Sequence, residues 1–158
     1  MPTIKLKTVI NAPKNKVFDL SRSIDLHKLS TVKSNEQAIA GVTSGLIGLG
    51  ESVTWKAKHF GFYQTLTSRI TEFKAPVCFV DEMEKGIFKK FRHEHLFEGD
   101  EDSTTMIDVL EYVSPLGVLG ILADKLFLEK YLKEFLISRN KAIKDYAESE
   151  KWKDVFGE

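Results

Sequence analysis

Apolar residues recur along this chain with two different periods, and the change of period predicts two parts. Between residues 51 and 113, apolar and polar residues alternate in short runs separated by turns, which is typical of an antiparallel meander of strands. From Leu119 to Ser149, apolar residues recur every three or four positions, and after Gly120 no glycine or proline interrupts the pattern, which predicts one long helix. We therefore expect a sheet that is followed by a single C-terminal helix.

Turn residues divide the rest of the chain into further elements. Before the meander, we expect a strand over Thr3–Ile10 and two short helices over Lys14–Ser21 and Ile24–Leu29. After the long helix, Lys151–Phe156 leaves open whether one more turn packs through its aromatic side chains. Within the meander, the breaks predict strands over Glu51–Phe60, Phe62–Phe73, Val77–Glu84, Ile87–Glu98 and Thr104–Val113.

Residues 41–50 contain four glycines, which marks a flexible or tightly turned connection before the meander. The segment lacks the Gly-Lys-Ser/Thr ending of a phosphate-binding loop and the Gly-x-Gly-x-x-Gly spacing of a dinucleotide-binding loop. Two interpretations stay open, a flap over a binding site or a loose surface loop. No cofactor is expected from the sequence.

The charge balance limits the classes of partner. Lys plus Arg total 23 and Asp plus Glu total 23, so the formal net charge is zero and a nucleic-acid partner is not expected. The most apolar stretch, Val113–Leu122, is too short to span a bilayer, so no integral membrane segment is expected. Cys78 is the single cysteine, which excludes an intrachain disulfide and fits a reducing cytoplasm.

The order of elements predicts a cavity. A chain of 158 residues favours one domain over residues 1–158, and its start lacks the apolar core of a signal peptide. A sheet with one apolar face must be covered, and the final helix is the only large cover that the sequence offers. A curved sheet around one helix cannot close everywhere, so we expect a cavity for a small hydrophobic molecule between them. The oligomeric state is not indicated.

The segments of the chain with the most distinctive sequences are Trp55–Gly61, Thr67–Pro76, Phe79–Asp81, Gly86–Phe88, Phe91–Phe97 and Pro115–Gly117 with Ala123 and Asp124. Together they resemble the START/Bet v 1-like (SRPBCC) superfamily, and within it the cyclase/dehydrase-like subgroup. The resemblance covers nearly the whole chain and implies an α+β helix-grip fold, in which a curved antiparallel sheet wraps around a long C-terminal helix and two short helices follow the first strand. That superfamily includes lipid carriers, hormone receptors, polyketide cyclases and dioxygenase domains, so the resemblance implies a cavity without naming its ligand.

Strand alternation predicts which side chains face the cavity. On the strand that contains His93 and His95, these two residues share a face with Phe91 and Phe97, while charged residues dominate the other face. On the last strand, the face containing Ile107, Val109, Glu111 and Val113 is expected to point inward. The candidate ligand-binding residues are Trp55, His59, Phe79, Asp81, Phe91, His93, His95, Phe97, Glu111, Leu132, Phe135, Leu136 and Arg139.

Three hypotheses compete for the inner histidines and carboxylates. They orient a ligand by hydrogen bonds, they are structural groups that satisfy one another, or they hold a metal ion. No third metal ligand is fixed by the sequence, so no metal is expected. Arg139 could pair with a ligand carboxylate or internally with Asp81 or Glu111.

The function favoured by these observations is the binding, without catalysis, of a small hydrophobic or amphipathic molecule, such as a lipid or a polyketide-like or isoprenoid-like compound. One alternative is a polyketide cyclase/dehydratase-type enzyme that uses His93 or His95 as its acid/base. Another alternative is an interaction module whose cavity no longer binds a ligand.

Overall fold

The computed structural model describes residues 2–59, 61–115, 122 and 127–157. In chain order, the elements are β1 (Thr3–Ile10), α1 (Lys14–Ser21), α2 (Ile24–Ser30), η1 (Val32–Ser34), β2 (Gln37–Gly41), β3 (Ser52–His59), β4 (Phe62–Lys74), β5 (Cys78–Lys85), β6 (Lys90–Gly99), β7 (Thr104–Val113), α4 (Glu129–Ala147) and α5 (Trp152–Phe156).

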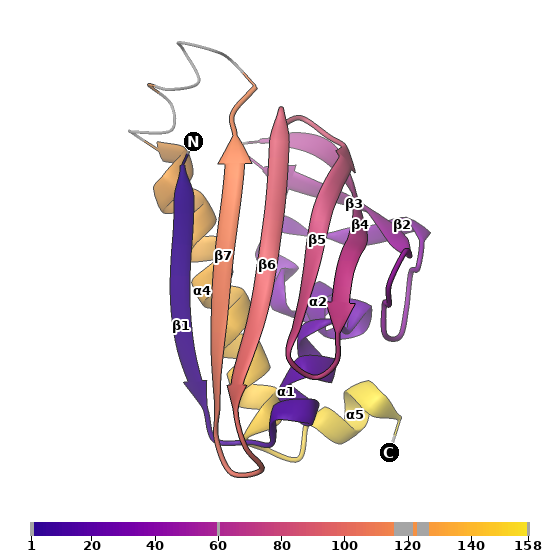
Figure 1. The fold of residues 1–158 in the computed structure, drawn as a ribbon. Helices are drawn as coiled ribbons and strands as arrows, with labels where there is room; N and C mark the ends of the chain where they lie inside the picture. The colour runs from indigo at the N-terminus through magenta and orange to yellow at the C-terminus, as the bar shows by residue number, and fades with distance from the viewer. Residues whose placement is uncertain (1, 60, 116–121, 123–126, 158) are drawn as a thin grey trace.

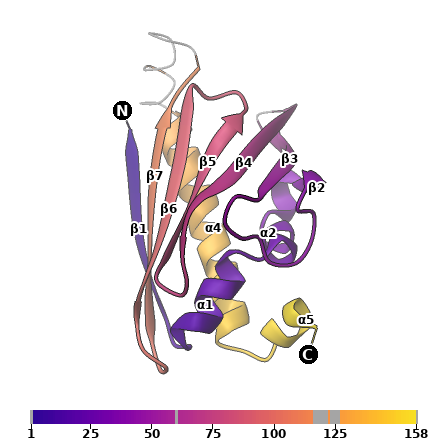
Figure 2. The same cartoon turned by 45° about the vertical axis from the view of Figure 1, so that its right-hand side comes forward.

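The strands form one sheet in the order β1-β7-β6-β5-β4-β3-β2, and every neighbouring pair is antiparallel. Strands β2 to β7 therefore follow one another as a meander, and β1 joins the free edge of β7 (Figure 1). The sheet curves, and α4 lies inside the curve together with α1 and α2 (Figure 2). This arrangement confirms the predicted helix-grip architecture.

Helix α4 covers the sheet because its apolar positions form one stripe. Its buried residues recur at steps of three or four positions, with Arg139 and Asn140 adjacent, which places them along one face of the helix. Leu136 packs in a cluster with Ile4, Leu110 and Tyr112 of the sheet, and Ile143 belongs to a second, larger cluster. The predicted helix began at Leu119, but most of residues 119–126 lie outside the described residues. Its end at Ala147 is two residues before the predicted one.

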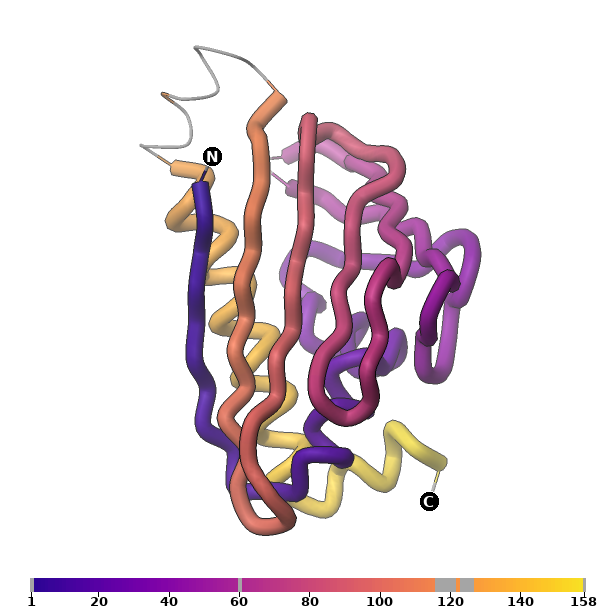
Figure 3. The backbone as a smooth tube through the Cα atoms, viewed as in Figure 1, coloured from indigo at the N-terminus to yellow at the C-terminus, as the bar shows by residue number. Residues whose placement is uncertain are grey.

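Helix α1 covers the end of the sheet that lies lowest in Figure 1, and α2 lies above it. Phe18 of α1 is buried, and its ring contacts the rings of Phe73, Phe79 and Phe97 at centroid distances of 5.4, 5.5 and 5.2 Å. Edge-to-face contacts of this kind add to the area that each ring buries. Phe97 therefore belongs to the packed core. The C-terminal α5, yellow in Figure 3, lies at this same end. There, Lys16 Nζ of α1 lies 4.2 Å from the centroid of the Trp152 ring.

Some element boundaries differ from the sequence prediction. Strand β2 was not predicted, because its five residues are mostly exposed and carry no clear alternation. Strand β6 begins at Lys90, three residues after the predicted start at Ile87, so the turn after β5 is longer than expected. The segment after the long helix does form a further turn, α5. Of the predicted strand Glu51–Phe60, residue 60 lies outside the described residues.

The glycine-rich segment is fastened to the rest of the fold. Backbone hydrogen bonds join Ile24 N to Gly45 O at 2.9 Å, Ile47 N to Arg22 O at 3.2 Å and Gly50 N to Ile70 O at 2.9 Å. Ile47 is buried and contributes to the wall of the cavity described below. The segment is thus anchored and forms part of the cavity wall, so of the two interpretations the loose surface loop is wrong, and the flap stays a prediction. Among the described residues, no helix is both long and apolar enough to cross a membrane.

Replacing Phe18 by alanine is expected to lower the free energy of unfolding by about 3–5 kcal/mol, because three aromatic neighbours lose their common partner and a cavity remains. Urea denaturation measures this change. Phe62→Ala is the control, because Phe62 is 72% exposed and its removal should cost less than about 0.5 kcal/mol. Similar losses in both variants would contradict the proposed role of Phe18.

Candidate ligand-binding cavity

A partly open cavity of about 220 Å³ lies between the inner face of the sheet and α4. Its walls come from β3 to β7, from α4, from α1 and α2, and from the glycine-rich segment. Most of the lining is apolar, with Trp55, Phe91, Leu110 and Phe135 among the larger side chains. All of the predicted candidate residues line this cavity except Phe97 and Glu111.

Glu111 was placed on the wrong face of β7. The hairpin pairs His95 with Asp108 and His93 with Leu110, and paired residues share a face, so Asp108 and Leu110 point inward. Glu111 pairs with Arg92 on the outer face. Alternation alone could not decide this point, because both faces of β7 are rich in apolar residues and each carries one carboxylate. Counting back from the turn that pairs Gly99 with Thr104 would have identified Asp108.

Asp108 is the centre of a buried polar cluster. Its side chain is fully buried. His93 Nε2 lies 2.8 Å from Oδ1, Asn140 Nδ2 lies 2.6 Å from Oδ2, and Arg139 Nη1 lies 3.5 Å from Oδ1. Burial by itself would raise the pKa of Asp108, but the hydrogen bond from His93, the nearby His95 ring and the charge of Arg139 hold that pKa well below its usual value. The carboxylate is therefore an ionised acceptor, and His93 donates from Nε2.

Arg139 connects this cluster to two helices. It donates from Nη1 to Asn140 Oδ1 at 3.0 Å and from Nη2 to the backbone oxygen of Ser21, the last residue of α1, at 3.1 Å. An internal ion pair was one of the two predicted roles of Arg139. Its partner is Asp108, and not Asp81 or Glu111.

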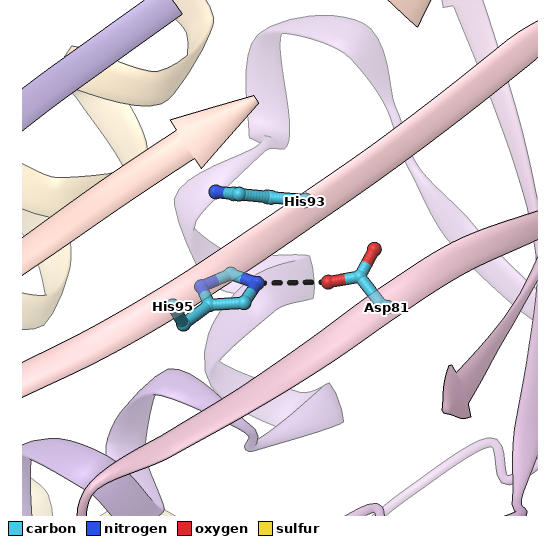
Figure 4. Close-up of side chains that lie close together, drawn as sticks. All are labelled: Asp81, His93 and His95. Atoms are coloured by element: carbon cyan, nitrogen blue, oxygen red, sulfur yellow. Dashed lines mark hydrogen bonds and ion pairs between the residues drawn. The ribbon is translucent and has the colours of Figure 1, made fainter. Parts of the chain in front are cut away.

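His95 is held from two sides. Its Nε2 lies 2.8 Å from Asp81 Oδ2, as Figure 4 shows, and its ring stacks on Phe79 at a centroid distance of 4.1 Å. Burial tends to raise the pKa of Asp81, but the hydrogen bond with His95 and the charges of His95, His93 and Arg139 together leave that pKa lowered. His95 Nδ1 is buried 3.4 Å from Asp108 Oδ1 without an aligned hydrogen bond. Neither nitrogen of His95 is free for the cavity.

His93 differs from its neighbour because one ring nitrogen remains free. Burial lowers the pKa of His93, and the adjacent His95 lowers it further, which favours the neutral ring. With the proton held on Nε2 by Asp108, Nδ1 carries a lone pair. Within the described residues, Nδ1 has no hydrogen-bond partner. Unlike Nδ1 of His95, it is not a buried atom. Since His93 lines the cavity, this nitrogen is accessible to a ligand.

Asp81, His93 and His95 could also offer atoms to a metal ion, because one ligand atom from each lies within 4.8 Å of the other two. Two histidines and one carboxylate suit several divalent transition metals. In this structure, however, His95 and Asp81 bond each other and His93 Nε2 bonds Asp108, so His95 has no nitrogen left for an ion. An ion would have to displace the bond between His95 and Asp81.

A second polar group lies further along the cavity. His59 Nδ1 and the Tyr131 hydroxyl share a short hydrogen bond, and burial, followed by the charge of Glu36, raises the pKa of Tyr131. Tyr131 is eight residues before Arg139 on one helix, so the two polar groups are about 12 Å apart along its axis. The sequence reasoning found His59 but not Tyr131 or Glu36, because these residues come from distant segments that carry no motif. His27, whose ring lies tilted beside that of Trp55 at a centroid distance of 4.3 Å, was missed for the same reason.

No protein-family model matches the chain, and no curated protein matches its sequence. Solved structures do match. Protein TTHA0849 from Thermus thermophilus is 18% identical, with a TM-score of 0.75 over 92% of this chain and 97% of that one. The ZhuI aromatase/cyclase from Streptomyces sp. R1128 is 15% identical, with a TM-score of 0.74 over 93% of each chain.

A START superfamily protein from Mycobacterium smegmatis matches with a TM-score of 0.69 and 14% identity, over 92% of this chain and 97% of that one. The chain has the START/Bet v 1-like helix-grip fold. At these identities, the START/Bet v 1-like similarity establishes the architecture alone, and the chemistry of the site depends on its own residues.

Replacing Asp108 by asparagine is expected to destabilise the START/Bet v 1-like fold of this chain by about 3–5 kcal/mol, because Arg139 then lies buried without its counter-charge. Glu111→Gln makes the same chemical change on the opposite face of the same strand and should cost less than about 0.5 kcal/mol. Urea denaturation of both variants gives the comparison. A larger loss for Glu111→Gln would mean that the faces of β7 are reversed.

The low pKa of Asp108 also predicts a loss of stability in acid. The unfolded chain, with an ordinary Asp pKa of about 3.9, takes up this proton more readily than the folded chain. The stability contributed by the ionised group is therefore present above that value and is lost as the pH falls through the folded-state pKa. Below the ordinary value, the free energy of unfolding should fall more steeply in the wild type than in Asp108→Asn. Parallel curves would refute this role.

Proposed function

We propose that the protein binds a small hydrophobic or amphipathic molecule inside this cavity. The observation that carries the proposal is an apolar, partly open space of about 220 Å³ with a rigid polar cluster in its wall. Binding sites for small molecules commonly combine an apolar lining with a few fixed polar groups that set orientation. The cytoplasmic location suggested by the single cysteine stays a prediction.

The distribution of polar groups favours an elongated amphipathic ligand. One polar region contains His93 and Asp81, and the other contains His59 and Tyr131, with apolar side chains such as Phe135 between them on α4. A lipid, a polyketide-like compound or an isoprenoid-like compound could place an apolar body against Phe135 and polar groups at its ends. The similarity to a structure described as an aromatase/cyclase supports the polyketide-like class.

The proposed contact residues are the predicted ones that line the cavity, without Phe97 and Glu111. Asp108 joins the site as a positioning residue, because it fixes the rings of His93 and His95 without facing the ligand itself. Arg139 acts with it, since its guanidinium is held by Asp108, Asn140 and the Ser21 carbonyl.

Filling the cavity tests the binding proposal. Leu132→Trp places a larger side chain in the space from α4 and should abolish binding, because the ligand and the indole would compete for the same volume. Native mass spectrometry of purified protein should show a bound small molecule in the wild type and none in this variant. Lys133→Trp on the exposed side of α4 is the matched control and should retain the ligand. Equal occupancy in both variants would contradict binding inside the cavity.

A cyclase/dehydratase-type activity is the second candidate function. The observation that favours it is the bond from His93 Nε2 to Asp108, which leaves Nδ1 as a base that faces the cavity. A carboxylate that fixes the tautomer of a catalytic histidine is a recurrent arrangement in enzymes. His95 does not qualify for this role, because Asp81 and the buried position of Nδ1 occupy both of its nitrogens.

A linear poly-β-ketone thioester mimic is the substrate class that tests this activity. If His93 is the base, His93→Gln should lose about 10²–10⁴-fold in cyclisation rate, which is the usual contribution of an acid/base. The same variant should still bind the mimic. Glu94→Gln, on the outer face of the same strand, should keep the full rate. Absence of turnover in the wild type would leave binding as the function.

A further inference from the structure

The hydrogen bonds of the buried cluster determine which polar atoms a ligand can meet. The Nε2 proton of His93 is used by Asp108, and the Nε2 proton of His95 is used by Asp81. His95 Nδ1 is sealed beneath the cavity wall. Two atoms remain available at this point of the lining, which are His93 Nδ1 and the second carboxylate oxygen of Asp81, whose side chain is 20% exposed.

Both of these atoms are hydrogen-bond acceptors. Because Asp108 is an ionised acceptor, the proton of the neutral His93 ring stays on Nε2, and Nδ1 presents its lone pair. Asp81, whose pKa is lowered by His95, presents a carboxylate oxygen that cannot donate. Neither atom has a hydrogen-bond partner among the residues that the structure describes. A donor on the ligand is what would satisfy them.

The positive charge of Arg139 does not reverse the preference of this site for a hydrogen-bond donor. Arg139 lies against Asp108 and also donates to Asn140 and to the backbone oxygen of Ser21, so its charge is matched inside the protein. A ligand carboxylate in contact with His93 Nδ1 would bring a second negative charge beside Asp81. Two like charges that lie side by side repel each other. An ammonium group would have to lose its water shell among apolar walls.

We propose that the ligand presents an uncharged hydroxyl group, of a phenol, enol or alcohol, which donates its one hydrogen to the free carboxylate oxygen of Asp81, beside His93 Nδ1. This inference rests on the proposed binding function and narrows its ligand class. Free fatty acids and other carboxylates are then poor ligands at this point, and ethers or ketones that only accept hydrogen bonds are weaker than the matching alcohols.

Three probes with one aromatic body test the preference. β-Naphthol offers a donor, β-methoxynaphthalene only an acceptor, and β-naphthoate a negative charge at neutral pH. Isothermal titration calorimetry should show that β-naphthol binds about tenfold or more tightly than either of the others, because a hydrogen bond to a charged acceptor contributes roughly that much.

Asp81→Asn supplies the decisive variant. Its amide oxygen can still accept from His95 Nε2, while its NH₂ group turns the atom that faces the cavity from an acceptor into a donor. The preference for β-naphthol over β-methoxynaphthalene should therefore fall to about twofold or less, or reverse, and β-naphthoate should gain affinity. Glu94→Gln makes the same change on the outer face of the adjacent strand and should leave the order of affinities unchanged.

The outcomes separate this inference from the binding function itself. Equal affinities for the three probes, or tightest binding of β-naphthoate, would overturn the donor inference while leaving the cavity a binding site. An unchanged preference in Asp81→Asn would also overturn it, provided that thermal melting shows the variant to be folded. Failure of all three probes to bind would count against both the inference and the proposed function.

Discussion

The structure depends on the need to neutralise one fully buried carboxylate. An unpaired charge at the position of Asp108 would cost several kilocalories per mole, so the folded chain must bring donors to it. These donors come from β6 through His93 and from α4 through Arg139 and Asn140. Asn140 also reaches Thr8 of β1, and Arg139 reaches the end of α1. One charge therefore fixes how the sheet, the long helix and the first short helix meet.

The same network decides what the cavity offers. Each proton that satisfies Asp108 or Asp81 is a proton that a ligand cannot receive, so the wall is left with acceptors at His93 and Asp81. The rings are also immobilised, since His95 lies between Phe79 and His93 at centroid distances of 4.1 and 3.8 Å. The polar groups are thereby held in position before a ligand arrives, which reduces the entropy lost on binding.

The sequence contains most of the fold, because periodicity is a local property. Strand and helix periods identified the meander and the final helix, and alternation placed His93 and His95 inward. Glu111 shows where this logic fails. Both faces of β7 are rich in apolar residues, the inner face toward α4 and the outer face on the opposite side of the sheet. The inner carboxylate therefore had to be found from the register. Tyr131 and Glu36 meet His59 only in three dimensions, and no spacing in the chain indicates that.

The long turn between β5 and β6 allows the volume of the cavity to vary independently of the strand register. Ile87 and Phe88 in this turn line the cavity, yet they precede the paired part of β6, which begins at Lys90. Insertions or substitutions here can alter the volume at one end of the cavity without shifting the register that sets His93 against Asp108. Descendants of this sequence could therefore change the size of the molecules they accept while inheriting an unaltered polar anchor.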